Sequence, residues 1–248
     1  MNHKSRIFVA LDVDRLDQAL KLVNRLKDHV AGFKVGLELI HSADSGAVQP
    51  LLAAGASRIF YDAKLHDIPN TVAGAVRAIA HLRVEMVTVH AGGGSEMLKS
   101  ACRSALGEAD GEKPAGLKII AVTLLTSIGE AALKEELMVD YAVGDYTVNL
   151  ARMAQAAGCH GIVCSPLEVS RMRKELGPEI CLITPGVRPA EAKAHDQVRT
   201  ATAGEAVQSG ASYIVVGRPI TQADDPVIAA ESINREIASA LGSAEGDR

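Results

Sequence analysis

The chain has 248 residues, of which 48% are hydrophobic, and a formal net charge of −4. This balance is typical of a globular protein with a sizeable core, and it argues against a general nucleic-acid binder, which usually carries a basic stripe. No run of about 18 apolar residues occurs and the N-terminus shows no signal peptide, so we expect no membrane span and no membrane partner. The 4 cysteines lack metal-binding spacing, and we expect reduced thiols in a cytoplasmic protein.

Short apolar segments alternate with helical patterns along the chain. Strands are predicted at 6–12, 32–36, 58–62, 85–90, 117–125, 161–164, 180–184 and 212–216. Helices are predicted at 15–29, 43–54, 69–82, 94–106, 143–157, 167–176, 203–209 and 226–241, and long loops at 126–141 and 185–199. Apolar strands that alternate with helices indicate a parallel sheet covered on both faces.

The number of strand-then-helix units favours a closed (β/α)8 barrel, the TIM barrel, over an open doubly wound sheet. No break in composition marks a domain boundary, so we expect one domain over residues 1–248 with a disordered tail at 242–248. With only 3 Phe, 4 Tyr and no Trp, the core must be built from Ala, Val, Leu and Ile.

Polar side chains gather where the predicted strands end, which is where such barrels carry their chemistry. These residues are Asp12, Lys34, Asp62, Lys64, His90, Thr126, Ser127, Arg188, Gln197, Gly217 and Arg218. Arg6, Arg58 and Glu85 lie at the opposite strand ends, where we expect a sparser set of partners. The sequence therefore predicts a functional site at the C-terminal mouth of the barrel.

One stretch carries three charges within six residues, namely Asp62, Lys64 and Asp67. Alternate side chains of a strand share a face, so Asp62 and Lys64 should point the same way. A lysine flanked by acids keeps its proton, so Lys64 fits a proton donor better than a Schiff-base nucleophile. With Lys34, the pattern suggests a carbanion stabilised beside a fixed cation and then protonated, without a divalent metal. A surface ion pair is the alternative interpretation.

A second candidate site follows the last predicted strand, at Gly217-Arg218-Pro219-Ile220. Glycine lets the backbone approach a ligand, and proline suits the first turn of a short helix. Backbone N–H groups at a helix start and a guanidinium group can bind phosphate, with Arg188 and Gln197 as further donors. We expect the loop at 186–197 to close over this site. A solvated surface arginine is the alternative for Arg218.

Seven blocks along the chain resemble orotidine 5'-phosphate decarboxylases of the bacterial type. They are D-x-K-x-x-D-I at 62–68, FVALD at 8–12, FKVG at 33–36, VTVHA at 87–91, LTS at 125–127, TPGVR at 184–188 and VVGRPI at 215–220. The resemblance implies conversion of orotidine 5'-phosphate to UMP and CO2 in pyrimidine biosynthesis. It also implies that no metal or organic cofactor takes part.

The resemblance further implies a role for each site residue. Lys64 protonates C6 of the pyrimidine as CO2 leaves, and Asp62 lies near the departing carboxylate. The substrate is also bound by Asp12 and Lys34 at the ribose, by Ile68, by Thr126 and Ser127 at the pyrimidine amide, and by Arg188, Gln197, Gly217 and Arg218 at the phosphate. Asp67 and Thr71 reach the neighbouring site of a homodimer.

Two other functions stay open on the sequence. Magnesium-dependent sugar-phosphate decarboxylases or aldolases of the same superfamily share D-x-K-x-x-D, but carry an acidic ligand on strand two, where this chain has Lys34. A nucleotide-binding barrel without catalysis would show a broken charge array. His66, His81 and His90 are interpreted as structural or surface histidines, and Glu38 as a carboxylate at a helix N-terminus.

Overall fold

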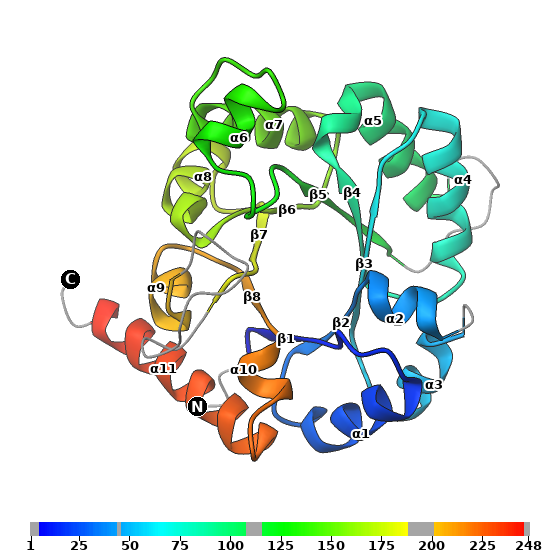
Figure 1. The fold of residues 1–248 in the computed structure, drawn as a ribbon, viewed down its shortest axis with the longest axis vertical. Coiled ribbons are helices and arrows are strands. Elements are labelled where there is room, and N and C mark those ends of the chain that lie inside the picture. Colours follow the sequence, from blue (N-terminus) through cyan, green and yellow to red (C-terminus); the bar gives the residue numbers. More distant parts are fainter. Residues whose placement is uncertain (1–4, 44–45, 108–115, 188–200, 246–248) are drawn as a thin grey trace.

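The computed structural model of the chain describes residues 5–43, 46–107, 116–187 and 201–245. Eight parallel strands pair in sequence order, and β8 closes on β1 to complete a barrel (Figure 1). An outer ring of helices surrounds the strands (Figure 1). The prediction of a (β/α)8 barrel is confirmed.

The strands are β1 (Ile7–Ala10), β2 (Gly32–Val35), β3 (Ile59–Leu65), β4 (Met86–His90), β5 (Lys118–Val122), β6 (Gly161–Val163), β7 (Cys181–Thr184) and β8 (Tyr213–Val216). The helices are α1 (Leu16–Leu26), α2 (Leu37–Ser42), α3 (Val48–Ala53), α4 (Pro69–Ala80), α5 (Gly94–Ala105), α6 (Glu130–Glu135), α7 (Val143–Ala156), α8 (Val169–Leu176), α9 (Ala203–Gln208), α10 (Arg218–Thr221) and α11 (Pro226–Glu245). Two 3-10 turns are η1 (Ala91–Gly93) and η2 (Pro166–Glu168).

Some elements differ from the sequence prediction. Helix α2 follows β2 directly, where no helix was expected, and α6 lies inside the segment expected to be a loop. Both helices have 6 residues, too few for a helical period to show in the sequence. Helix α11 continues to Glu245, so the expected disordered tail is wrong for 242–245, and 246–248 lies outside the described residues. None of the described helices is long and apolar enough to cross a membrane.

Side-chain alternation along the strands divides the apolar residues between two layers. One face of each strand packs under the helices, as Ile7, Val9 and Ile59 do. The other face fills the barrel interior, where Phe8, Ala10, Phe60, Met86, Ile120, Ile183 and Val215 form a separate cluster. A residue two positions after an interior residue on the same strand therefore also points toward the barrel axis.

The N-terminal end of the barrel is closed by a dense polar cluster. Arg58 donates to both carboxylate oxygens of Glu85, from Nε to Oε2 at 2.5 Å and from Nη2 to Oε1 at 2.9 Å. Its Nη2 also donates to the hydroxyl of Tyr213 at 3.1 Å. Its guanidinium carbon lies 5.2 Å from the ring centroid of Phe8 and 4.9 Å from that of Tyr213, and Lys118 Nζ is 3.0 Å from Glu85. The expectation of sparse partners at this end, the barrel floor, is wrong. The floor brings together charges from the starts of β3, β4 and β5, which lie far apart in the sequence.

Glu85 depends on this arrangement for its charge. Burial by itself would raise the pKa of Glu85, but hydrogen bonds and charge from Arg58 and Lys118 hold it below its ordinary value. The group therefore stays ionised although it is half-buried. Removal of one partner should leave a carboxylate that water cannot fully solvate.

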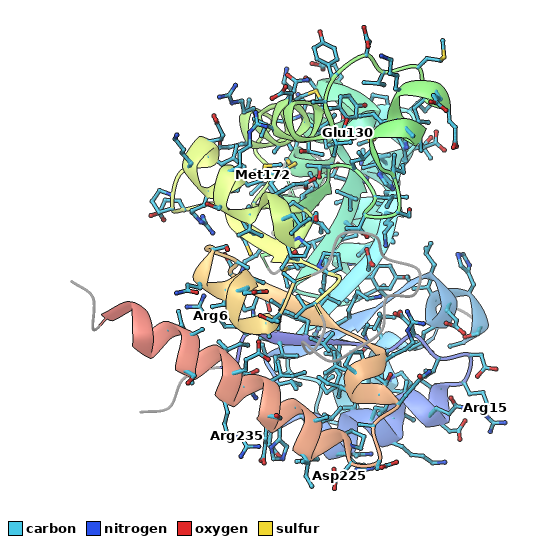
Figure 2. All side chains as sticks on the ribbon, turned by 60° about the vertical axis from the view of Figure 1, so that its left-hand side comes forward. Arg6, Arg15, Glu130, Met172, Asp225 and Arg235 are labelled. Atoms are coloured by element: carbon cyan, nitrogen blue, oxygen red, sulfur yellow. The ribbon has the colours of Figure 1, made fainter. Side chains whose placement is uncertain are left out.

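We expect Arg58→Ala to lower the free energy of unfolding by about 2 kcal/mol, since it removes a bidentate partner of Glu85 and two ring contacts. Urea denaturation followed by circular dichroism measures this. Arg15→Ala is the control, because Arg15 projects from the outer surface and pairs with Asp17, which is also exposed (Figure 2). Equal denaturation midpoints for the two variants would contradict a stabilising floor cluster.

Candidate active site

A cavity of about 800 Å³ opens at the C-terminal end of the strands. Much of its wall comes from inward-facing positions two residues apart along the strands. The strands themselves provide Ala10, Lys34, Phe60, Asp62, Lys64, Val122, Val163 and Val215, and the residues just after β1, β5 and β8 provide Asp12, Leu124 and Gly217. The same alternation that fills the interior with apolar side chains thus places charged ones above them.

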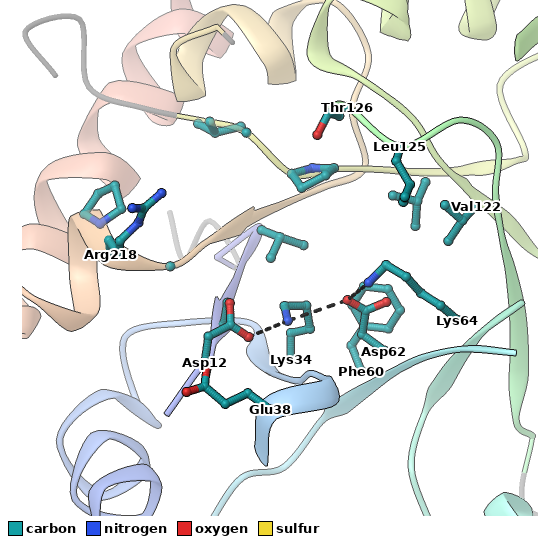
Figure 3. Close-up of a pocket in the computed structure, with 18 of the residues that line it drawn as sticks. Asp12, Lys34, Glu38, Phe60, Asp62, Lys64, Val122, Leu125, Thr126 and Arg218 are labelled. Atoms are coloured by element: carbon teal, nitrogen blue, oxygen red, sulfur yellow. Dashed lines mark hydrogen bonds and ion pairs between the residues drawn. The ribbon is translucent and has the colours of Figure 1, made fainter. Parts of the chain in front are cut away.

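Four of these side chains form a row of alternating charge (Figure 3). Lys34 Nζ lies 2.9 Å from Asp12 Oδ1 and 3.6 Å from Asp62 Oδ2. Lys64 Nζ lies 2.7 Å from the same oxygen of Asp62. The row runs from Asp12, two residues after β1, to side chains of β2 and β3, and these three strands are neighbours in the barrel. The prediction that Asp62 and Lys64 share a face is confirmed.

Asp62 is the buried carboxylate of the row. Only 8% of the residue is exposed, the same fraction as for Lys34. Burial alone would raise its pKa, but the charges of Lys34 and Lys64, with hydrogen bonds from Lys64 and Thr88, hold the pKa below its ordinary value. Asp62 is therefore an anion at neutral pH, positioned beside two ammonium groups and facing the cavity.

Space for the Lys34–Asp12 pair depends on a glycine. A Cβ atom at Gly36 would lie 2.6 Å from Lys34 Nζ and 2.9 Å from Asp12 Oδ1. Contacts under 3.0 Å force some atom to shift, so a side chain at this position would displace one of the two charges. Gly36 also precedes α2, whose first turn brings Glu38 to the cavity wall.

The far side of the cavity is built by the ends of β7 and β8. Pro185, Gly186 and Val187 line it after β7, and α10 begins directly after Gly217 and brings Arg218 to the wall (Figure 3). Val187 pairs with Ala201 in an isolated parallel bridge, so the two ends of the intervening segment are adjacent. Arg188, Gln197 and most of the expected closing loop lie outside the described residues.

Thr126 lines the cavity, as the sequence predicts, but four other predicted site residues do not. Ser127, Asp67, Ile68 and Thr71 are all exposed. Asp67 accepts a hydrogen bond at Oδ1 from the backbone N–H of Ile68, at 2.6 Å. Within one chain, Lys64 therefore meets Asp62, while Asp67 faces outward at the start of α4.

Several residues of the site were missed by sequence reasoning. Glu38, Leu125, Thr221 and Gln222 line the cavity, and Thr88 lies beneath it, hydrogen-bonded to Asp62 and to the backbone of Lys64. Thr88 did leave a signal, since it is the polar residue inside an otherwise apolar strand segment, Met86–Val89. For Thr221 and Gln222, the only signal in the sequence was their position directly after the VVGRPI block.

Two histidines lie beside the site, and one of them, His90, is shifted toward its neutral form. The rings of His66 and His90 lie 5.4 Å apart. Burial, together with the nearby His66 and Lys64, lowers the pKa of His90, so its neutral form prevails. Among the described residues, no group of three or more His, Cys, Asp and Glu side chains could hold a metal ion.

The fold and the site define the class of the protein. A (β/α)8 barrel with charged side chains gathered at its C-terminal mouth has the architecture of a barrel enzyme. The chain also matches the family described as "Orotidine 5'-phosphate decarboxylase / HUMPS family" over residues 5–233. It therefore belongs to this family, and the resemblance seen in the sequence blocks is confirmed.

Individual relatives are similar over nearly their full length. The chain is 46% identical to the orotidine 5'-phosphate decarboxylase of Moorella thermoacetica, over 96% of this chain and 94% of the relative. It is 43% identical to that of Heliobacterium modesticaldum, over 97% and 99%. The crystal structure of orotidine 5'-phosphate decarboxylase from Lactobacillus acidophilus superposes with a TM-score of 0.81 at 39% identity, and the match covers 94% of this chain and 99% of that one.

We expect the Asp62 carboxyl to titrate at a lower pH than an ordinary aspartate, which titrates near about 3.9, because the net effect of its surroundings is a lowered pKa. Because the pKa of Asp62 is lower in the folded state than in the unfolded state, its ionisation stabilises the fold at pH values above the unfolded-state pKa. This stabilisation is lost as the pH falls through the folded-state pKa. Carbon-13 NMR titration, with the signal assigned from Asp62→Asn, measures it. A midpoint above that ordinary value would contradict the expectation.

Proposed function

We propose that the chain decarboxylates orotidine 5'-phosphate to UMP and CO2, a step of pyrimidine biosynthesis. The row Asp12–Lys34–Asp62–Lys64 is the observation that carries this proposal. It provides an anion and a proton donor 2.7 Å apart at the wall of a cavity. Relatives named for this activity match the chain over nearly its whole length.

Lys64 is the proton donor of the proposed reaction. The bond from C6 of the pyrimidine to the carboxylate breaks, CO2 leaves, and the electron pair stays on C6. Such a vinylic carbanion has little delocalisation, so fixed charge must lower its energy. The ammonium group of Lys64 provides that charge and then transfers a proton to C6, and the neutral amine regains a proton from solvent.

Asp62 acts on the substrate carboxylate. Ion pairs with Lys34 and Lys64 fix the position of the Asp62 carboxylate. It therefore cannot rotate away from a second anion that binds beside it. Repulsion weakens as the carboxylate becomes neutral CO2, and the bound substrate is therefore disfavoured more than the transition state. Lys34 and Asp12 bind the ribose hydroxyls and keep the row in order.

The remaining binding residues surround the substrate. Thr126 and Ser127 bind the pyrimidine amide, and Ile68 lies beside the substrate. Arg218 and the backbone at Gly217 bind the phosphate, together with Arg188 and Gln197, because a guanidinium group and backbone N–H groups suit a phosphate dianion. Binding energy from this remote group can close the site around the reacting atoms.

The reaction is proposed to need no metal. Lys34 and Lys64 flank Asp62 on both sides, and two ammonium groups repel a divalent cation at that carboxylate. A magnesium-dependent relative would need an acidic side chain on β2, where this chain carries Lys34.

The enzyme is proposed to be a homodimer in which Asp67 and Thr71 complete the neighbouring site. The segment from His66 to Thr71 is exposed in the single chain, and 67% of Ile68 is accessible although it is apolar. A second copy would cover this surface, and its Asp67 would be the other carboxylate beside Lys64. Such a shared site follows from a two-fold interface, in which each copy contributes the same residues.

A cytoplasmic location is proposed as well. Four cysteines are free, and three of them are buried. The sulfurs of Cys102 and Cys159 lie 3.8 Å apart, at hydrogen-bonding distance, and are not joined as a disulfide. Unpaired thiols of this kind are typical of a reducing compartment.

We expect the purified protein to consume orotidine 5'-phosphate in excess EDTA, and Lys64→Ala to lower kcat by about 10²–10⁴-fold or more, the usual contribution of a positioned proton donor. The fall in ultraviolet absorbance of the substrate measures turnover. Lys99→Ala is the control, because Lys99 lies on the outer helix α5 and pairs with Glu96. Activity lost to EDTA would instead favour a magnesium-dependent sugar-phosphate enzyme, and UMP binding without turnover would favour a non-catalytic barrel.

Subunits that carry Asp67→Ala or Lys64→Ala should each be inactive alone and active when mixed. If Asp67 serves the neighbouring site, each mixed dimer has one intact site and one doubly altered site. Random exchange makes about half of the dimers mixed, so about a quarter of wild-type activity should return. Turnover after denaturation and co-refolding measures it, with each variant refolded alone as the control. An absence of recovery in a verified mixed dimer would exclude the shared site.

A further inference from the structure

The geometry points to Thr88 as a positioning residue that holds Asp62 and Lys64 in their reactive arrangement through a single hydroxyl group. The inference rests on the proposed decarboxylation, because it concerns how the two reacting side chains of that site are held in position. Thr88 is 0% exposed and does not line the cavity, so it cannot touch a substrate. Any effect it has on the reaction must pass through the residues that it contacts.

The first observation is a break in the pairing of β3 with β4. Tyr61 pairs with Val87, and Leu65 pairs with Val89, so four steps along β3 match two steps along β4. Residues 62–64 of β3 therefore lie opposite Thr88 alone. An irregularity of this kind leaves strand residues without their normal ladder partners and changes the direction of their side chains.

The second observation is the backbone of Lys64 at this break. Its φ angle is 49°, in the left-handed region that non-glycine residues rarely adopt. A strained residue of this kind persists only where its surroundings hold it. The backbone N–H of Lys64 donates to Thr88 Oγ1 at 2.7 Å, which replaces the missing ladder bond.

The third observation is the direction of the two hydrogen bonds. A backbone N–H can only donate, so Thr88 Oγ1 accepts from Lys64 and keeps its own proton for another partner. That proton is donated to Asp62 Oδ1 at 3.0 Å. Asp62 Oδ2 is the oxygen that meets Lys34 and Lys64. Thr88 thus occupies one carboxylate oxygen, and the two lysines share the other.

These contacts make the hydroxyl a common anchor for both reacting groups. Without it, the Asp62 carboxylate could rotate about its terminal bond, and the backbone that carries the Lys64 ammonium could relax from its left-handed conformation. A displacement of about 1 Å in a catalytic group can cost about 10²-fold in rate. Substrate binding through the ribose and phosphate contacts should change little, since those contacts lie elsewhere along the cavity.

The test compares Thr88→Val, which keeps the shape and removes the hydroxyl, with Thr88→Ser, which keeps the hydroxyl. Thr147→Val is the matched control, because Thr147 is also 0% exposed, donates to the carbonyl of Gly144 at 3.3 Å, and lies on the outer helix α7. For each variant, kcat, KM, affinity for UMP and thermal unfolding are measured. Thr88→Ala replaces Thr88→Val if the valine variant does not fold.

We expect Thr88→Val to lower kcat by about 10²-fold with little change in KM or UMP affinity, and Thr88→Ser to restore most of kcat. Thr147→Val should lower only the unfolding temperature. A wild-type kcat in Thr88→Val, or an equal loss in Thr88→Ser, would overturn the inference while the decarboxylase assignment stands. Absence of turnover by the wild type would overturn the proposed function and this inference together.

Discussion

The structure of the site depends on one electrostatic constraint, the ionised and buried carboxylate of Asp62. A carboxylate removed from water is unfavourable unless charges and donors replace its hydration. Here Lys34 and Lys64 meet one oxygen and Thr88 meets the other. These three partners come from β2, β3 and β4, so only a sheet that places those strands side by side can keep the charge in place. The row of charges can therefore form only because the barrel places these strands next to one another.

The two ends of the barrel use the same kinds of side chain for different purposes. At the floor, Arg58 and Glu85 form a bidentate pair, and aromatic rings cover the guanidinium group. Every charge there has a protein partner, and the cluster serves stability. At the mouth, Lys64 and Asp62 border an open cavity, so the charges that balance each other can also act on a bound molecule. Access to the cavity distinguishes a reactive ion pair from a structural one.

Much of the site was predictable from local patterns. Asp12, Lys34, Asp62 and Lys64 could be placed because each follows an apolar run at an inward-facing position, and side-chain alternation needs no knowledge of the fold beyond the strand itself. Glu38 and Gln222 could not be assigned to the wall, since short helices after β2 and β8 bring them there. Asp67 lies outside the cavity in a single chain, and its proposed role depends on a second copy. Arg188 and Gln197 stay predictions, because they lie outside the described residues.

The sequence by itself determined the class of fold, the order of the strands and the set of charges at the barrel mouth. These features follow from hydrophobic periodicity, which indicates strands and helices within short windows of the sequence. Only the tertiary structure decided how the charges meet. The left-handed backbone at Lys64, the shifted register between β3 and β4, and the hydroxyl that Thr88 shares between Lys64 and Asp62 all arise from pairing with a strand 24 residues away. Strand register is set by packing between distant segments, and no local pattern along β3 contains that information.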